Sequence, residues 1–158
     1  MTAQTLEYQG KDYVVEIMQD DYQPKPWQEF DGHGEVSDWT SRDKTPGELI
    51  LATHKGQKLY YDFQATTKRA KLEGWSVTTS ENLTFKQRVR AAVLADFEHL
   101  QKFCDGRWYF AYLSVTDPRT GDTEALGGIE YSEGGLQEVE NYALELAMIL
   151  RGREVWAA

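Results

Sequence analysis

Cysteine, long apolar runs and targeting signals are scarce or missing in this sequence. Cys104 is the single cysteine among 158 residues, so no disulfide can form within the chain, and a reducing cytosol is the simplest setting. No apolar run approaches the ~20 residues that span a bilayer. Residues 1–9 lack the basic and apolar segments of a secretion signal. We therefore expect a cytoplasmic protein without membrane association.

Motifs that would identify an enzyme are also missing. The chain has no serine nucleophile elbow, phosphate-binding loop, dinucleotide fingerprint or zinc signature. Cys104 falls on the apolar stripe of a predicted helix, and His99 lies about 140° away around that helix, so the two side chains do not form a catalytic dyad. We assign no catalytic residue, expect no cofactor, and favour a protein that is not an enzyme.

Positive charge is scarce and unevenly distributed. The net charge is −9, yet residues 55–90 carry eight basic and three acidic side chains, whereas residues 1–54 and 91–158 each have a net charge of −7. Because phosphate binding needs positive charge, free nucleic acid is not the expected partner of most of the surface. An acidic surface favours a basic partner, such as a nucleic-acid-binding protein. Ordinary solubility charge is the alternative explanation.

Apolar residues are abundant enough for a hydrophobic core. They make up 41% of the chain, with 13% aromatic residues and no repeat or linker, so we expect one globular domain over residues 1–158. The residue patterns predict the order β-β-loop-β-β-α-α-β-β-α. We expect an α+β fold in which about three helices pack on a single antiparallel sheet of about six strands. The predicted strands are 6–9, 13–18, 48–53, 58–61, 107–116 and 124–131, and the predicted helices are 63–73, 84–104 and 136–151.

Local signals mark several of these boundaries. Asp62 is a predicted N-cap and Gly74 a predicted left-handed C-cap of one helix. Thr84 and Gln87 have the spacing of a capping box at the start of the next helix. Gly127-Gly128 suggests a bulge or a close contact in the last strand.

The segment 19–47 is predicted to be a long loop, and it carries large aromatic rings. Such rings are costly to leave in water, so we expect Trp27, Phe30 and Trp39 to pack on the sheet and to place His33 near the surface. The polar residues of this loop that we regard as a candidate binding site are Asp31, His33, Glu35 and Asp38. A hydrogen-bonded turn is the alternative. A hard metal ion would also fit this composition, but we assign no metal site.

Two further charged sets have a structural and a functional interpretation. The last predicted helix region is acidic, and its carboxylates either imitate a series of phosphates or form a solvated face; they are Glu133, Glu138, Glu140 and Glu145. The basic segment either binds nucleic acid, with Tyr60, Tyr61 and Trp75 as stacking partners, or is a solvated helix face. Its candidate residues are Lys68, Arg69, Lys71, Arg88 and Arg90.

Several short motifs recur in one known group of proteins. They are Pro26-Trp27, Asp31-Gly32-His33-Gly34-Glu35-Val36-Ser37-Asp38-Trp39, Pro46-Gly47-Glu48, Tyr60-Tyr61-Asp62, Glu73-Gly74-Trp75 and Ala95-Asp96-Phe97-Glu98, followed by Cys104 and Trp108. In these features, over roughly residues 5–150, the chain resembles a group of small uncharacterised acidic proteins of tailed bacteriophages and prophages. Those proteins often have a longer loop, sometimes with cysteines, in place of the short turn at 117–122, so no metal role of that loop is carried over.

The resemblance implies a phage origin and a bacterial host cytoplasm as the location. Small acidic phage proteins that are not virion parts often act on host machinery, including CRISPR and restriction effectors. We predict an accessory protein that binds and inhibits a host nucleic-acid-binding or defence protein through an acidic surface. The alternative is a nucleic-acid-binding or metal-dependent nucleic-acid-processing protein that uses residues 55–90 and the His33 loop. The target and the oligomeric state stay open.

Overall fold

The computed structural model describes residues 2–29, 31–78 and 81–157. Its elements are β1 (Thr2–Tyr8), β2 (Lys11–Gln19), α1 (Pro26–Glu29), β3 (Glu48–His54), β4 (Gln57–Asp62), α2 (Phe63–Glu73), α3 (Phe85–Cys104), β5 (Tyr109–Thr116), β6 (Thr123–Tyr131) and α4 (Leu136–Ala157). The chain divides into two compact units. Unit 1 consists of Met1–Gln23 and Trp108–Ala158, and unit 2 consists of Pro24–Arg107.

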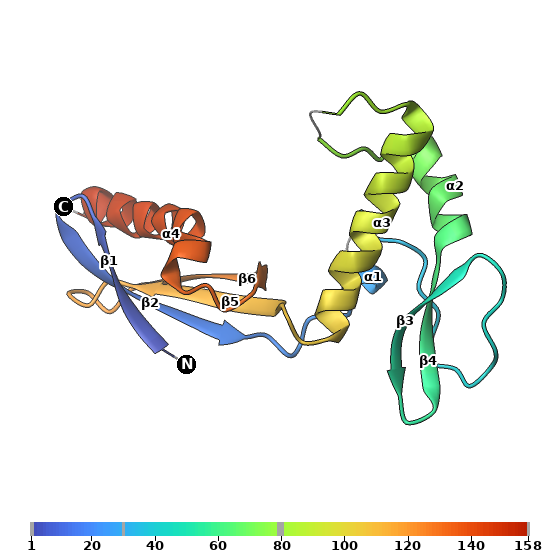
Figure 1. The fold of residues 1–158 in the computed structure, drawn as a ribbon. Coiled ribbons are helices and arrows are strands. Elements are labelled where there is room, and N and C mark those ends of the chain that lie inside the picture. The colour runs from blue at the N-terminus through green and yellow to red at the C-terminus, as the bar shows by residue number, and fades with distance from the viewer. Residues whose placement is uncertain (1, 30, 79–80, 158) are drawn as a thin grey trace. The chain divides into compact units, whose positions relative to one another are not determined.

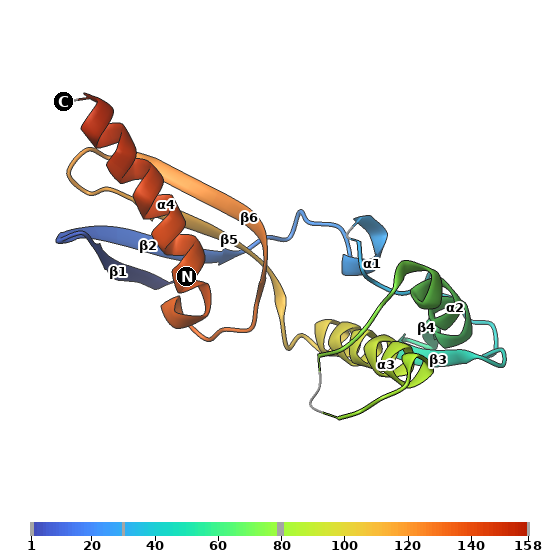
Figure 2. The ribbon, with the colours of Figure 1, turned by 90° about the horizontal axis from the view of Figure 1, so that it is seen from above.

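Unit 1 is a four-stranded antiparallel sheet of order β1-β2-β5-β6, with α4 lying across one face (Figure 1, Figure 2). Side chains of a strand alternate between the two faces of a sheet, whereas a helix presents one face at spacings of three and four residues. The buried core follows both patterns; its members include Tyr13, Val15, Leu113, Val115 and Ile129 from the sheet and Val139, Ala143, Leu146, Ala147 and Leu150 from α4.

The sheet of unit 1 contains the bulge that the glycine pair suggests. Ala111 pairs with Ile129 and Leu113 pairs with Leu126, so the register shifts where Gly127 and Gly128 lie on β6. Gly128 has a φ of 70°, a left-handed conformation that glycine adopts without steric cost. The bulge in the last strand is therefore confirmed.

Unit 2 combines the β3–β4 hairpin with α2 and α3. The predicted caps are confirmed: the side chain of Asp62 accepts a hydrogen bond from the Ala65 N–H, and Gly74 ends α2 at a φ of 74°. Thr84 and Gln87 form both hydrogen bonds of a capping box before α3. A second core joins these elements and includes Leu51, Leu59, Tyr61, Ala70, Val89, Val93 and Leu100.

The predicted single sheet of six strands with three helices is wrong, although the α+β class holds. β2 pairs directly with β5, so the β3–β4 hairpin forms a separate two-stranded sheet. A loop segment pairs with that hairpin instead, through bridges of Val36 with Tyr61 and of Thr40 with Lys58. A fourth helix, α1, lies within the predicted long loop. The prediction of one globular domain over residues 1–158 stays a prediction.

In residues 2–29, 31–78 and 81–157, no helix has the length and apolar character needed to cross a bilayer.

Candidate functional site

The carboxylate of Asp96, on α3, is the centre of the contacts made by the His33 loop. Its Oδ1 lies 2.7 Å from Nδ1 of His33, and its Oδ2 accepts hydrogen bonds from the Gly34 N–H and the Tyr61 hydroxyl, both at 2.8 Å. An ionised carboxylate only accepts hydrogen bonds, so His33 donates from Nδ1 in this arrangement. The side chains of His33 and Asp96 are only 12% and 7% exposed.

Tyr61 explains why residue 34 is a glycine. A Cβ atom at position 34 would lie 2.4 Å from the Tyr61 hydroxyl oxygen, much closer than a van der Waals contact. Tyr61 is fully buried on β4. Burial, followed by the negative charge of Asp96, raises the pKa of the Tyr61 hydroxyl far above its ordinary value. Tyr61 therefore stays protonated, and its hydroxyl donates a hydrogen bond to Asp96.

Arg69, on α2, fixes the other side of the same loop. Its guanidinium contacts the Glu35 carboxylate and the His33 carbonyl oxygen, and its Nε lies 3.3 Å from Glu73. The guanidinium also lies over the ring of Trp75, 5.6 Å from the ring centre. Cation–π stacking and paired hydrogen bonds restrict this side chain to one geometry. Arg69 is thus engaged within unit 2 and is not free to bind phosphate.

Backbone pairing extends the attachment of the loop beyond Glu35. The Glu35 N–H donates to the Thr66 hydroxyl at 3.0 Å. The Ser37 N–H donates to the Tyr60 carbonyl at 2.9 Å, and the Ser37 hydroxyl accepts from the Tyr60 N–H at the same distance. The loop therefore lies along β4 as a third, irregular strand, which satisfies backbone groups that an edge strand would leave open.

The four candidate residues of the loop fall into two groups. His33 and Glu35 contact Asp96 and Arg69, so they hold the loop in place, whereas Asp31 and Asp38 are exposed. The rings of His33 and His99 stack with centres 6.3 Å apart. His33 is partly exposed, in agreement with a place near the surface, but its ring is engaged with Asp96 of α3. Within the described ranges, no three His, Cys, Asp or Glu side chains gather as a possible metal site.

The aromatic residues of the loop also differ in environment. Trp27 packs against the core of unit 2 and meets Phe103 edge-to-face at 6.1 Å. Trp39 is 43% exposed and contacts His54, so its predicted role as a buried anchor is wrong. Trp39 lies between the two bridges that Val36 and Thr40 make with β4. Phe30 lies outside the described residues.

The acidic candidates of unit 1 are likewise divided. The carboxylate of Glu138 accepts hydrogen bonds from the Ser132 N–H, the Ser132 hydroxyl and the Gly134 N–H, so it caps the start of α4. Burial opposes ionisation of Glu138, but these hydrogen bonds outweigh it and lower its pKa. Glu133, Glu140 and Glu145 are exposed. Only these three remain available to a partner.

Exposed apolar side chains of α4 lie beside one of these carboxylates, that of Glu145. Tyr142, Met148 and Ile149 are 44%, 54% and 46% exposed. By helical spacing, residues 142, 145, 148 and 149 share the side of α4 that lies away from its buried residues, whereas Glu140 lies at the other edge of the exposed surface, about 160° around the helix from Tyr142. We call Glu140, Tyr142, Glu145, Met148 and Ile149 the outer α4 face.

The negative charge of the chain lies almost entirely on unit 1. Unit 1 carries 14 acidic and 4 basic side chains, a net charge of −10, whereas unit 2 carries 12 acidic and 13 basic side chains, a net charge of +1. Both ends of the chain belong to unit 1, which is why the sequence shows two acidic regions around a basic one. The negative charge is thus a property of one folded unit.

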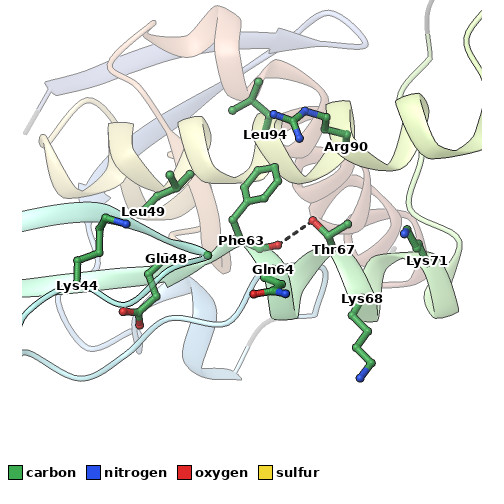
Figure 3. Close-up of a pocket in the computed structure, with 11 residues that line it drawn as sticks. Lys44, Glu48, Leu49, Phe63, Gln64, Thr67, Lys68, Lys71, Arg90 and Leu94 are labelled. Carbon is green, nitrogen blue, oxygen red and sulfur yellow. Dashed lines mark hydrogen bonds between the residues drawn. The ribbon is translucent and has the colours of Figure 1, made fainter.

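The basic candidates surround a groove in unit 2. This groove has a volume of about 900 Å³, and Lys68, Lys71 and Arg90 line it together with Lys44. Figure 3 shows the Phe63 ring directed toward Leu94 and Arg90 of α3, with Lys44 and Lys71 toward opposite ends. The structure therefore brings together three of the five basic candidates. Arg69 belongs to the contacts of the His33 loop, and Arg88 is exposed outside the groove lining.

The proposed stacking partners are not available at this groove. Tyr60 and Tyr61 are fully buried, and Trp75 is half-buried beneath Arg69. Cys104 is also partly buried, and burial, with the charge of Asp105 second, raises the pKa of its thiol to about 11. Its thiolate is therefore a minor species at neutral pH.

Comparison with protein-family models, curated proteins and solved structures gives no match. The residues described above therefore carry the evidence for a function. Among them, Asp96 was missed as a site residue by sequence reasoning. A signal for it exists, because Val89, Val93, Asp96 and Leu100 recur at spacings of three and four residues. A carboxylate within such an apolar stripe needs buried partners.

Proposed function

We propose that this chain is a phage-encoded accessory protein that binds a basic, nucleic-acid-binding protein of the bacterial host and inhibits it. The observation that carries the proposal is the charge of −10 on unit 1 against +1 on unit 2. A surface of one sign attracts partners of the opposite sign and discourages binding to nucleic acid. CRISPR and restriction effectors are the proposed target class, and the resemblance to phage and prophage proteins supports that origin.

The outer α4 face is the proposed contact surface. It combines exposed apolar side chains, Tyr142, Met148 and Ile149, with the free carboxylates of Glu140 and Glu145. Protein interfaces typically bury an apolar centre and surround it with polar groups. In the target protein, these carboxylates would occupy the basic groove that otherwise holds the phosphates of the nucleic acid. Inhibition would then be competitive with nucleic acid and would weaken as salt rises.

The test is co-purification of the full chain from host cells, with the bound proteins identified by mass spectrometry and their affinity measured at increasing salt. We expect a basic nucleic-acid-binding partner, released by salt and displaced by its own nucleic acid. Glu140→Gln/Glu145→Gln should weaken binding about tenfold, since two charges at the contact are removed. Recovery of no partner at low salt would count decisively against the proposal.

A second charge-neutralising variant identifies which carboxylates matter. Asp31→Asn/Asp38→Asn removes two exposed carboxylates from the loop of unit 2 and should change affinity by less than about twofold. If this variant weakens binding and the α4 variant does not, the loop is the contact surface and the assignment to unit 1 is wrong.

Nucleic-acid binding or processing remains the second candidate, because Lys68, Lys71 and Arg90 line one groove. It is less well supported than protein binding, since Arg69 is engaged and Tyr60 and Tyr61 are buried. A gel-shift assay with single- and double-stranded DNA and RNA, with and without Mg²⁺, separates the two functions. A shift at low salt, or turnover that needs the metal ion, would favour this candidate.

A further inference from the structure

We propose that the groove of unit 2 binds an acidic peptide segment with large apolar side chains, in the manner of an amphipathic helix from a partner protein. This site is distinct from the outer α4 face and does not rest on the function proposed for unit 1. Helix-in-groove recognition combines an apolar floor, which buries side chains, with charged groups at the rim, which set orientation. The groove has both features.

The floor of the groove is apolar and comes from three elements. Leu49 lies on β3, Phe63 on α2 and Leu94 on α3, and Leu94 is 43% exposed in the absence of a partner. The hydroxyl of Thr67 donates to the Phe63 carbonyl at 2.7 Å, so it adds no unsatisfied polar group to the floor (Figure 3). A volume of about 900 Å³ can accept several large side chains.

The rim of the groove is positive. Lys44, Lys68, Lys71 and Arg90 all line it. The one carboxylate in the lining, Glu48, is already bound by two hydrogen bonds from Arg42, at 2.9 and 2.7 Å. Its charge is therefore neutralised locally, and the groove attracts a negatively charged ligand.

An acidic peptide suits this groove better than a nucleic acid does. Binding of single-stranded nucleic acid relies on exposed rings on which bases stack. Phe63 is the aromatic residue in the lining, and the Arg90 guanidinium lies over its ring, 5.5 Å from the centre. Burial of aliphatic side chains against Leu49 and Leu94 is instead favourable, because it removes apolar surface from water. The carboxylates of a bound helix would pair with the rim lysines where they lie along its flanks or near its ends.

Peptide binding can be measured with the full chain and a fluorescein-labelled peptide of about 14 residues with Leu and Glu at helical spacing. Fluorescence anisotropy at low salt should show saturable binding. Two control peptides keep the pattern, one with Gln for every Glu and one with Ser for every Leu. Each should bind at least about tenfold more weakly, because the groove uses charge and apolar contact together. Equal binding of either control peptide would overturn the proposal.

Matched variants locate the binding site. Lys68→Glu/Lys71→Glu and Leu94→Ser should each weaken peptide binding about tenfold. Lys55→Glu/Arg88→Glu makes the same charge change outside the groove lining, and Leu72→Ser changes a leucine that is 86% exposed. Both control variants should bind within about twofold of the wild type. Melting temperatures confirm folding, and Leu94→Ser keeps the test valid if the charge reversal unfolds the chain.

Other occupants give different results, and each would overturn the proposal. A labelled oligo-dT that binds when the peptide does not, and is lost in Lys68→Glu/Lys71→Glu, would show a nucleic-acid site. Self-association of the wild type, removed by the same variant in analytical ultracentrifugation, would show that a second copy fills the groove. Glu140→Gln/Glu145→Gln should leave peptide binding unchanged, which keeps this result separate from that of the proposed function.

Discussion

Nδ1 of His33 lies 2.7 Å from Oδ1 of Asp96, which joins a loop to a helix residue 63 positions later in the chain. The same carboxylate holds Gly34 and Tyr61. A charged group with so little exposure is stable in the fold only when its hydrogen-bonding capacity is filled. The His33 loop and Asp96 are therefore structurally dependent on each other.

Replacement of Asp96 by alanine should destabilise unit 2 strongly. Asp96→Ala leaves the Gly34 N–H, the Tyr61 hydroxyl and His33 without their acceptor, and we expect a loss of about 3–5 kcal/mol in the free energy of unfolding. Urea denaturation followed by tryptophan fluorescence measures it. Glu98→Ala, an exposed carboxylate on the same helix, is the control and should change stability by less than about 0.5 kcal/mol. Equal effects of the two substitutions would contradict this role of Asp96.

Two neighbouring glycines should respond differently to alanine. At Gly34 a Cβ atom would lie 2.4 Å from the hydroxyl of buried Tyr61, so Gly34→Ala should cost about 3 kcal/mol, or prevent folding. At Gly32 the φ is 84° but no atom lies within 4 Å of the added Cβ. Gly32→Ala should therefore cost only about 1 kcal/mol, the conformational strain. Urea midpoints of both variants check the order, and a larger loss at Gly32 would refute the close contact at Gly34.

The two tryptophans that flank the loop should differ in their contribution to stability. Trp27 is partly buried and packs against the core of unit 2, so Trp27→Ala should cost about 3 kcal/mol. Trp39 is 43% exposed, and Trp39→Ala should cost only about 1 kcal/mol because Trp39 buries a smaller apolar area than a core residue does. Thermal melts followed by far-UV circular dichroism measure both. The opposite order would mean that Trp39, rather than Trp27, anchors the loop.

Glu48 should make stability depend on pH in the acidic range. Hydrogen bonds from Arg42, followed by that from the Thr45 N–H, lower its pKa to about 2, whereas an unfolded glutamate titrates near 4.3. The stabilisation is fully present above the unfolded value and is lost as pH falls toward the folded value. Glu48→Gln should therefore be less stable than the wild type at pH 7, and the difference should shrink between about pH 5 and pH 2.

Urea unfolding at a series of pH values tests this expectation. Asp43→Asn removes a neighbouring exposed carboxylate and is the matched control, with little change in stability expected across the range. A difference between Glu48→Gln and the wild type that stays constant with pH would show that the Arg42 contact does not depend on the charge of Glu48.

Local sequence signals predicted the elements of the fold well, but not how the strands are partnered. Asp62, Gly74 and the Thr84–Gln87 pair mark helix ends because their hydrogen bonds involve residues only a few positions away. Strand partners depend on which edges meet, and period-two alternation carries no information on that choice. The sequence therefore indicated six strands and could not show that β2 pairs with β5.

The candidate sites show the same limit. Composition identified the charged residues, but their availability depends on contacts between distant positions, such as Arg69 with Glu35. The sequence does not show that His33 is engaged, because its partner, Asp96, lies far along the chain. The groove likewise joins residues from Lys44 to Leu94. No short motif encodes such an arrangement.

The division of the chain into units also bears on synthesis at the ribosome. Unit 2 is one continuous segment, whereas unit 1 needs β5, β6 and α4, which are translated last. Domains generally fold as units during synthesis, beginning from the N-terminal side. The β1–β2 hairpin thus emerges first, yet an isolated hairpin is marginally stable. The acidic unit 1 should therefore be completed only after the nearly neutral unit 2 has formed. A factor that acts late on the nascent chain would meet unit 2 folded and unit 1 still incomplete.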